Sequence, residues 1–264
     1  VQVIGFEGNV ARPAGIRRLS FYPAQLHAAV QPKAGGGLLR ALEAGNGHAE
    51  NILKKGQCGV KIHNINGKME RQITKGNYDV ANFYGYDAQD GRFFYSSHQE
   101  SPLRTAIYSA DKSGKERKIS TEVGSNDAIF STTMKYFLNI YSSATCPPVT
   151  TLRDATNGKV LSTMIDNKKL KEDITPLLGS KEFFTFKTSE GVELNGYMIK
   201  PQNFDSSKKY PVIMYQYSGP GSQEVKDAWN MGFYPGAQWE SYMAQQGFVF
   251  VCVDGRGTGA RGAE

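Results

Sequence analysis

The sequence has few cysteines and no long hydrophobic run, and these two absences exclude several classes of protein. Three cysteines in 264 residues are too few for a disulfide scaffold. Cys252 lies inside an apolar stretch, where a small buried side chain is expected. No stretch approaches the length of a membrane-spanning helix, and Val1 is not followed by a basic start and an apolar core. We therefore expect a soluble globular chain without a membrane segment, whose compartment cannot be inferred from cysteine usage.

Concentrated charge is also absent. The net charge of +6 is spread over Lys-Gly and Lys-Glu turns, and no basic run is interleaved with aromatic residues. This distribution argues against nucleic-acid binding and favours a solvated surface. The sequence contains no cluster of metal-ligating residues and no phosphate-binding loop, so we expect no metal and no cofactor.

Residues 1–55 differ from the rest of the chain in composition. The first Asp is Asp79, and Lys33 is the single Lys before Lys54. Leu38 to Ala44 has the length of two helical turns, but the rest of the segment shows no sustained period of 2 or 3.6. We assign residues 1–55 no function, and two interpretations stay open: the segment is poorly ordered, or it is foreign to the rest of the chain.

From about Gly56 onwards, short strands repeat at a period in the forties. Three alternating strands end in turns whose glycines, Gly67, Gly114 and Gly158, are spaced 47 and 44 residues apart. Two of these turns are Asn-Gly, which favours a hairpin because both central positions need a positive φ. Phe93 and Phe137, in two further matching strands, are also 44 residues apart. Four strands per repeat at this period predict blades of a β-propeller.

We expect residues 56–165 to form two nearly complete blades and the end of a third. Because a blade buries its faces against its neighbours, further blades should precede these in a longer protein. An all-β sandwich with coincidental turn spacing is the alternative. Residues 166–180 are charged and are predicted to be a linker with one helical turn.

After this linker the pattern predicts an α/β sheet. A hairpin of 183–187 and 192–199 precedes a buried strand from Val212 to Tyr217, a helix over 237–246 and a second apolar strand over 248–253. This order is typical of an α/β sheet in which one covered strand lies beside another.

Tyr217 is the candidate catalytic residue. Its strand stops at Ser218-Gly-Pro-Gly221, which no regular element can cross. A buried strand that ends in a Gly-rich turn is a common place for the chemistry of open α/β sheets. From these residues alone, Tyr217 is either a hydrogen-bond donor in an active site or a tyrosine that packs the sheet edge.

Two signatures resemble a known family. The stretch YQYSGPGSQ at 215–223 and the stretch VDGRGTG at 253–259 are similar to the first two signatures of the catalytic domain in the dipeptidyl peptidase IV group of prolyl oligopeptidases. The stretch QITKGNYD at 72–79 and the strand repeats resemble the last propeller blades of that family. The resemblance covers about Gly56 to Glu264. It implies a mixed fold, with the last blades of a β-propeller followed by the first strands and helix of an α/β-hydrolase domain at 181–264.

The resemblance also implies a function. Members are serine exopeptidases that release Xaa-Pro or Xaa-Ala dipeptides from peptide N-termini through an acyl-enzyme. Their substrates have Pro or Ala at the second position, and full-length members are often homodimers outside the cytoplasm, in the periplasm or extracellular space. The tyrosine at the position of Tyr217 donates its hydroxyl to the oxyanion. The glycines of 254–259 are expected to turn the chain behind the active site, with Arg256 in a salt bridge.

The nucleophile of such an enzyme is missing from the sequence. A Gly-x-Ser-x-Gly elbow does not occur, and the order Ser, Asp, His would place the triad downstream. We therefore expect an internal fragment that is inactive alone. Two alternatives stay open: a non-catalytic propeller-containing binding protein of this family, and a related oligopeptidase of different specificity.

Overall fold

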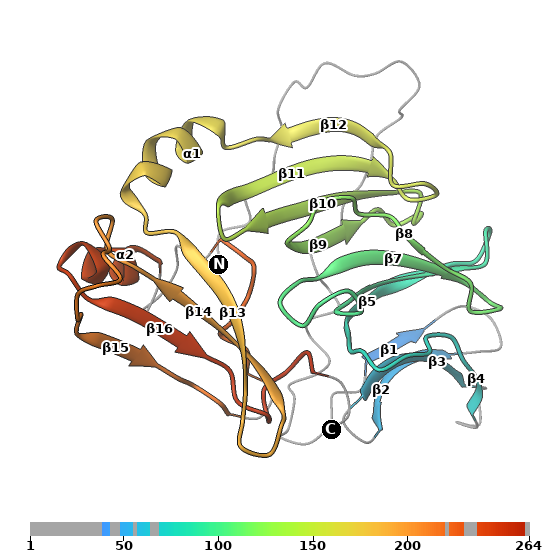
Figure 1. Cartoon of the computed structure of the whole chain (residues 1–264). Coiled ribbons are helices and arrows are strands. Elements are labelled where there is room, and N and C mark those ends of the chain that lie inside the picture. The colour runs from blue at the N-terminus through green and yellow to red at the C-terminus, as the bar shows by residue number, and fades with distance from the viewer. Residues whose placement is uncertain are drawn as a thin grey trace, which may run out of the picture.

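The computed structural model describes residues 39–42, 48–54, 57–63, 69–219, 222–229 and 237–261. Within these residues the strands form four sheets of four strands each, and the structure is mostly β (Figure 1). Three sheets are antiparallel and follow one another in the sequence; we call them the repeat sheets. The fourth sheet contains both antiparallel and parallel pairs and comes last.

Each repeat sheet is a meander in which sequential strands pair. Their strands are β1 (Leu39–Leu42), β2 (His48–Lys54), β3 (Gln57–His63) and β4 (Met69–Gln72) in the first, β5 (Val80–Asp87), β6 (Arg92–Ser97), β7 (Ala106–Asp111) and β8 (Glu116–Lys118) in the second, and β9 (Ser125–Phe130), β10 (Tyr136–Ser143), β11 (Cys146–Asp154) and β12 (Val160–Ile165) in the third.

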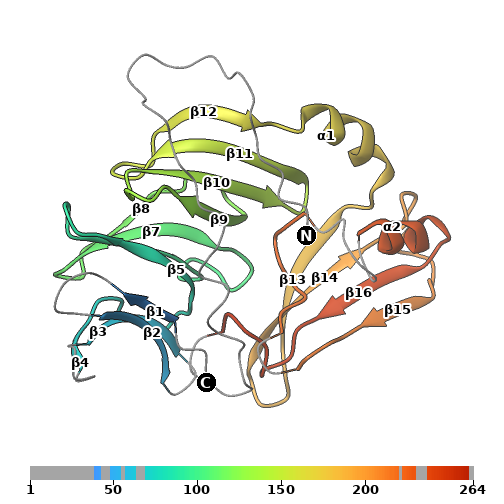
Figure 2. The ribbon, with the colours of Figure 1, turned by 180° about the vertical axis from the view of Figure 1, so that it is seen from behind.

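The repeat sheets lie face to face, and strand β6 shows what holds them together (Figures 1 and 2). Successive side chains of a strand point to opposite faces. Phe93 and Tyr95 accordingly join the core shared with the first sheet, whereas Phe94 joins the core shared with the third. All three rings are almost fully buried, and burying such a side chain contributes roughly 1.5–3 kcal/mol. The stack is compatible with successive blades of a propeller.

The contacts between repeat sheets recur. Arg71 of β4 donates to the carbonyl of Lys112 in the second sheet (2.6 Å), and Arg117 of β8 donates to the carbonyl of Thr156 in the third (3.0 Å). In the first and second repeat sheets, the last strand thus carries an arginine that reaches the turn between the last two strands of the next sheet. This equivalence is independent support for a structural repeat.

The turn glycines contribute to the same junctions. Gly114 and Gly158 have φ values of 88° and 78°, in the left-handed region that favours glycine. A Cβ atom at Gly158 would lie 2.2 Å from the carbonyl oxygen of Ile119, and one at Gly114 would lie 2.9 Å from that of Ile73. The predicted hairpins of β7 with β8 and β11 with β12 are therefore confirmed. The Asn66-Gly67 turn lies outside the described residues.

The helical prediction for Leu38 to Ala44 is wrong, because residues 39–42 form strand β1. Leu, Arg and Ala are good helix formers, but pairing with β2, from Leu39 opposite Asn51 to Leu42 opposite His48, decides the backbone conformation. The first repeat is consequently a sheet of four strands, and two of them lie within the segment that the sequence left unassigned.

The connection to the fourth sheet is helical and exposed. Helix α1 (Lys168–Ile174) and the 3₁₀ turn η2 (Thr175–Leu177) contain no buried residue. The Asn167 side chain, just before α1, donates to the carbonyl of Pro148 at 2.7 Å and ties the helix start to β11. No helix among the described residues is long and apolar enough to cross a membrane.

The fourth sheet has the order β13-β14-β16-β15 and lies beside the repeat sheets (Figures 1 and 2). Strands β15 and β16 are parallel, and helix α2 connects them in sequence. Trp239 of α2 packs edge-on against Phe250 of β16, with ring centroids 5.7 Å apart. The remaining elements are β13 (Lys181–Lys187), β14 (Glu193–Ile199), β15 (Val212–Tyr215), α2 (Ala237–Gln245) and β16 (Val249–Val253).

The prediction of a fully buried strand over 212–217 is wrong in two respects. Strand β15 ends at Tyr215, and among the described residues it is the edge strand of the sheet. Val212 and Met214 are each 61% exposed, while Ile213 and Tyr215 pack against the core. An apolar run shows that a strand is fit for burial, but it does not reveal whether both faces are covered. Cys252 in β16 is fully buried, as predicted.

Candidate functional site

Tyr217 follows the end of β15 by two residues, where the backbone has left the sheet. Its side chain is 58% exposed, so the sheet does not bury it. No hydrogen bond links its hydroxyl to another of the described residues. A Cβ atom at Gly219 would lie 3.3–3.4 Å from the Tyr217 ring, so glycine leaves room for this ring position. The phenol is therefore presented to solvent, as a donor for a bound group would be.

The turn that carries Tyr217 is bonded to the turn after β16. The Ser218 hydroxyl oxygen accepts a hydrogen bond from the backbone N–H of Gly255 at 3.1 Å. The Ser222 hydroxyl donates towards the carbonyls of Gly219 (2.6 Å) and Tyr217 (3.1 Å), and the Ser222 carbonyl accepts from Gly259 N–H at 2.8 Å. The glycine-rich stretch 254–259 thus donates backbone hydrogen bonds to both ends of the Tyr217 turn, at Ser218 and at Ser222.

Residues 222–229, which we call the brace segment, continue from this turn towards the repeat sheets. Asp254, only 3% exposed, accepts the backbone N–H groups of Glu224 and Val225 at 3.0 and 3.1 Å. Val225 is fully buried in the core of the fourth sheet, where Leu103 from the second repeat sheet also packs. The start of the brace segment is therefore fixed to the fourth sheet.

The end of the brace segment is fixed to the repeat sheets through Asp227. Its carboxylate pairs with the Arg104 guanidinium at 2.9 Å and accepts the N–H of Ala144 at 3.0 Å. Its backbone N–H donates to the Leu103 carbonyl at 2.9 Å, and its carbonyl accepts from the Ser125 hydroxyl at 3.0 Å. One residue of the segment thus contacts both the second and the third repeat sheets.

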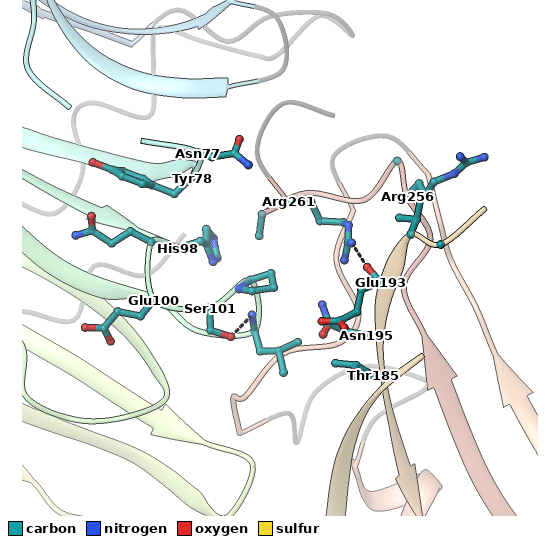
Figure 3. Close-up of a pocket in the computed structure, with 17 residues that line it drawn as sticks. Asn77, Tyr78, His98, Glu100, Ser101, Thr185, Glu193, Asn195, Arg256 and Arg261 are labelled. Carbon is teal, nitrogen blue, oxygen red and sulfur yellow. Dashed lines mark hydrogen bonds between the residues drawn. The ribbon is translucent and has the colours of Figure 1, made fainter. Parts of the chain in front are cut away.

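A cavity of about 1170 Å³ opens between the second repeat sheet and the fourth sheet (Figure 3). The loop after β6 lines one side, and the β13–β14 hairpin with the turn after β16 lines the other. Burial lowers the pKa of His98, which favours its neutral form at pH 7. The ionisable lining side chains are those of Tyr78, His98, Glu100, Glu193, Arg256 and Arg261.

Two arginines of this cavity have partners in the β13–β14 hairpin. Arg256 forms an ion pair with Glu190, which confirms its predicted role in a salt bridge. Arg261 donates to the backbone carbonyl of Glu193. Tyr217 does not line this cavity. The quoted motifs at 72–79 and 253–259 contain some of the lining residues, among them Tyr78 and Arg256. Sequence analysis did not predict the cavity itself, because its walls come from loops that are distant in the sequence.

The comparisons with known proteins all point to one family. The family model of the dipeptidyl peptidase IV (DPP IV) N-terminal region matches residues 26–148. The chain is 33% identical over 202 residues to a probable dipeptidyl-aminopeptidase B from Podospora anserina, covering 74% of this chain and 21% of that protein. It is 28% identical over 217 residues to dipeptidyl peptidase 4 from Trichophyton rubrum, covering 78% of this chain and 27% of that protein.

Among solved structures, the crystal structure of Porphyromonas gingivalis dipeptidyl peptidase 4 is similar, with 44% identity and a TM-score of 0.78 over 84% of this chain and 31% of that one. The chain belongs to the dipeptidyl peptidase IV family of the prolyl oligopeptidase group. It spans about a fifth of the length of the first relatives it matches. The match from residue 26 onwards includes part of the segment that the sequence left unassigned.

Proposed function

We propose that the chain is part of a serine exopeptidase that releases N-terminal Xaa-Pro or Xaa-Ala dipeptides through an acyl-enzyme. The observation that carries the proposal is the exposed phenol of Tyr217, placed on a turn bonded to both the fourth sheet and the brace segment. The names of the relatives support the reaction class.

The fourth sheet is, in this proposal, the opening of an α/β-hydrolase sheet over residues 181–264. The parallel pair β15 and β16, connected through α2, has the strand-helix-strand order of that fold. In such hydrolases the loop after the third strand supplies one oxyanion donor, and Tyr217 stands in the loop after the third strand of this sheet. The three repeat sheets, which begin with β1 and not at residue 56, are then propeller blades, and 166–180 connect the two parts.

Tyr217 would act on the tetrahedral intermediate. A serine hydroxyl attacks the carbonyl carbon of the substrate, and the carbonyl oxygen becomes an oxyanion. A phenolic O–H that already points into the site stabilises this charge without reorganisation. The nucleophile and its partners would come from the rest of the protein, since this sequence has no Gly-x-Ser-x-Gly elbow. The chain alone should therefore not react with a fluorophosphonate probe.

The substitution Tyr217→Phe in the full-length enzyme tests the role of the hydroxyl. It retains the ring and its packing but removes the donor, so kcat on a Gly-Pro chromogenic substrate should fall about 10²–10³-fold with little change in KM. Tyr242→Phe is the matched control, because Tyr242 is similarly exposed (56%) but lies on helix α2. A Tyr217→Phe enzyme with wild-type kcat would refute the proposed role.

The same assay separates the alternatives for the whole protein. A dipeptidyl peptidase should cleave Gly-Pro and Gly-Ala substrates only when their amino terminus is free. Cleavage of substrates with a blocked amino terminus would indicate an oligopeptidase of different specificity. Peptide binding with no cleavage and no fluorophosphonate labelling would indicate a binding protein of the same family.

A further inference from the structure

We propose that Asp254 is a positioning residue for Tyr217. Its carboxylate holds the two successive amides of Glu224 and Val225 and so fixes the turn that presents the phenol. This inference rests on the proposed function of Tyr217, because it assigns Asp254 an effect on the reaction only through that side chain.

Asp254 is well placed to act as a fixed point. It directly follows β16, which lies between β14 and β15 in the sheet, and its backbone N–H donates to the Asn195 carbonyl at 3.0 Å. The side chain is 3% exposed, so water does not compete for its oxygens. Backbone and side chain are therefore both anchored.

The two amides that Asp254 accepts need a partner of this kind. Glu224 and Val225 belong to no helix or strand, and Val225 is fully buried. A buried N–H without an acceptor is costly, so such groups are nearly always paired. Oδ1 accepts from Glu224 and Oδ2 from Val225, which uses both oxygens of the carboxylate. An asparagine would offer one acceptor and would turn an NH₂ group towards the other N–H.

A short path of hydrogen bonds connects Asp254 to Tyr217. Ser222, two residues before Glu224, donates to the Tyr217 carbonyl at 3.1 Å. The Ser218 hydroxyl, next to Tyr217, accepts from the N–H of Gly255, the neighbour of Asp254. The turn is thus bonded to Asp254 and Gly255 at two places: at Ser218, just after Tyr217, and beyond its far end at Glu224 and Val225. Losing the Asp254 contacts would weaken the hold on the far end, where the bond from Gly259 N–H to the Ser222 carbonyl remains, and would let the phenol shift from its position.

The kinetic test uses the full-length enzyme and a double-mutant cycle. Asp254→Asn should lower kcat about 10–100-fold with little change in KM, since small misplacements of a catalytic group carry losses of this order. In a Tyr217→Phe background, Asp254→Asn should lower kcat no further, because the donor that it positions is already missing. Asp205→Asn is the control: this exposed Asp also accepts a backbone N–H, that of Ser207, but lies in a distant surface loop.

Two kinetic results would overturn the inference: full additivity of the two losses, or a kcat for Asp254→Asn equal to that of the control. Amide hydrogen exchange on the wild-type chain tests the geometry independently of catalysis and of any variant's folding. Glu224 and Val225 should exchange more slowly than Lys226. Fast exchange at both would contradict the bonds to Asp254. If the amides are protected but Tyr217→Phe retains full kcat, the proposed function fails, while the hydrogen bonds from Glu224 and Val225 to Asp254 are confirmed.

Discussion

The repeat sheets and the fourth sheet are held by different kinds of contact. Between repeat sheets the same bonds recur, as Arg71 to Lys112 and Arg117 to Thr156 show. Near Tyr217 the contacts occur once: Asp254 accepts two amides of the brace segment, and Asp227 holds its other end. Repeated contacts suit the stacking of similar units, whereas single contacts made by buried carboxylates fix one loop in one place.

This difference indicates where substitutions should be tolerated. A junction between repeat sheets is held by several modest contacts and a large apolar core, so the loss of a single polar bond there should change the stability little. The brace segment depends on a few bonds that involve buried charges, and each bond should matter more. The predictions that follow compare the two regions, all measured as the change in the free energy of unfolding of this chain in urea.

The largest expected effect in the repeat sheets comes from Gly158→Ala. Alanine would have to adopt the positive φ of this position, and its Cβ atom would lie 2.2 Å from the Ile119 carbonyl oxygen. We expect a loss of about 3 kcal/mol, from roughly 1–2 kcal/mol for the left-handed backbone and the rest for the clash. Gly191→Ala is the control, because Gly191 has a φ of 82° and nothing within 4 Å. Equal losses at both positions would show that contact with the neighbouring repeat sheet adds nothing to the cost of the substitution.

The substitution Asp227→Ala tests the link between the regions. It removes the acceptor of the Ala144 N–H and the partner of Arg104. We expect a loss of about 2 kcal/mol, chiefly from the N–H left without a partner, because Arg104 is 42% exposed and can be solvated. Arg104→Ala should therefore cost less than Asp227→Ala. The reverse order would mean that the ion pair, and not the amide bond, anchors the segment.

A pH effect is expected at Asp87 in the second repeat sheet. Burial alone would raise the pKa of its carboxyl, but hydrogen bonds from Lys135 and from the Gln89 and Asp90 amides outweigh burial and lower it. A lowered pKa in the folded state stabilises the fold above the unfolded value of 3.8, and this contribution is lost as the pH falls through the folded pKa. Asp87→Asn should flatten the loss of stability below about pH 4. An unchanged acid limb would contradict this.

The smallest effects should come from Arg71→Ala and Arg117→Ala. Each removes one exposed hydrogen bond to a turn carbonyl, so each should cost about 0.5–1 kcal/mol, and the two costs should be similar. Because the two arginines lie far apart in the sequence and share no partner, their effects should add in the double variant. Strongly unequal or coupled effects would argue against equivalent junctions.

The repeat was predictable because turn chemistry is local. Gly114 and Gly158 mark real hairpin turns, and the helix at 237–246 forms as α2. The strand β1 and the edge position of β15 were not predictable, since both depend on pairing partners elsewhere in the chain. The same holds for the bonds of the Asp254 and Asp227 carboxylates, which join residues 29 to 123 positions apart. Tyr217 was found because its turn carries a motif, and its catalytic role stays a prediction.

The most direct test of the role of Tyr217 is a structure of the full-length enzyme with its serine trapped as a tetrahedral boronate adduct of a Gly-Pro analogue. The adduct places an oxygen where the oxyanion forms, so geometry can be measured without kinetic assumptions. We predict that the Tyr217 hydroxyl lies about 2.7–3.1 Å from that oxygen, with the brace segment still bonded to Asp254 and Arg104. A phenol turned away from the adduct, with another group bonded to the oxygen, would contradict the proposal.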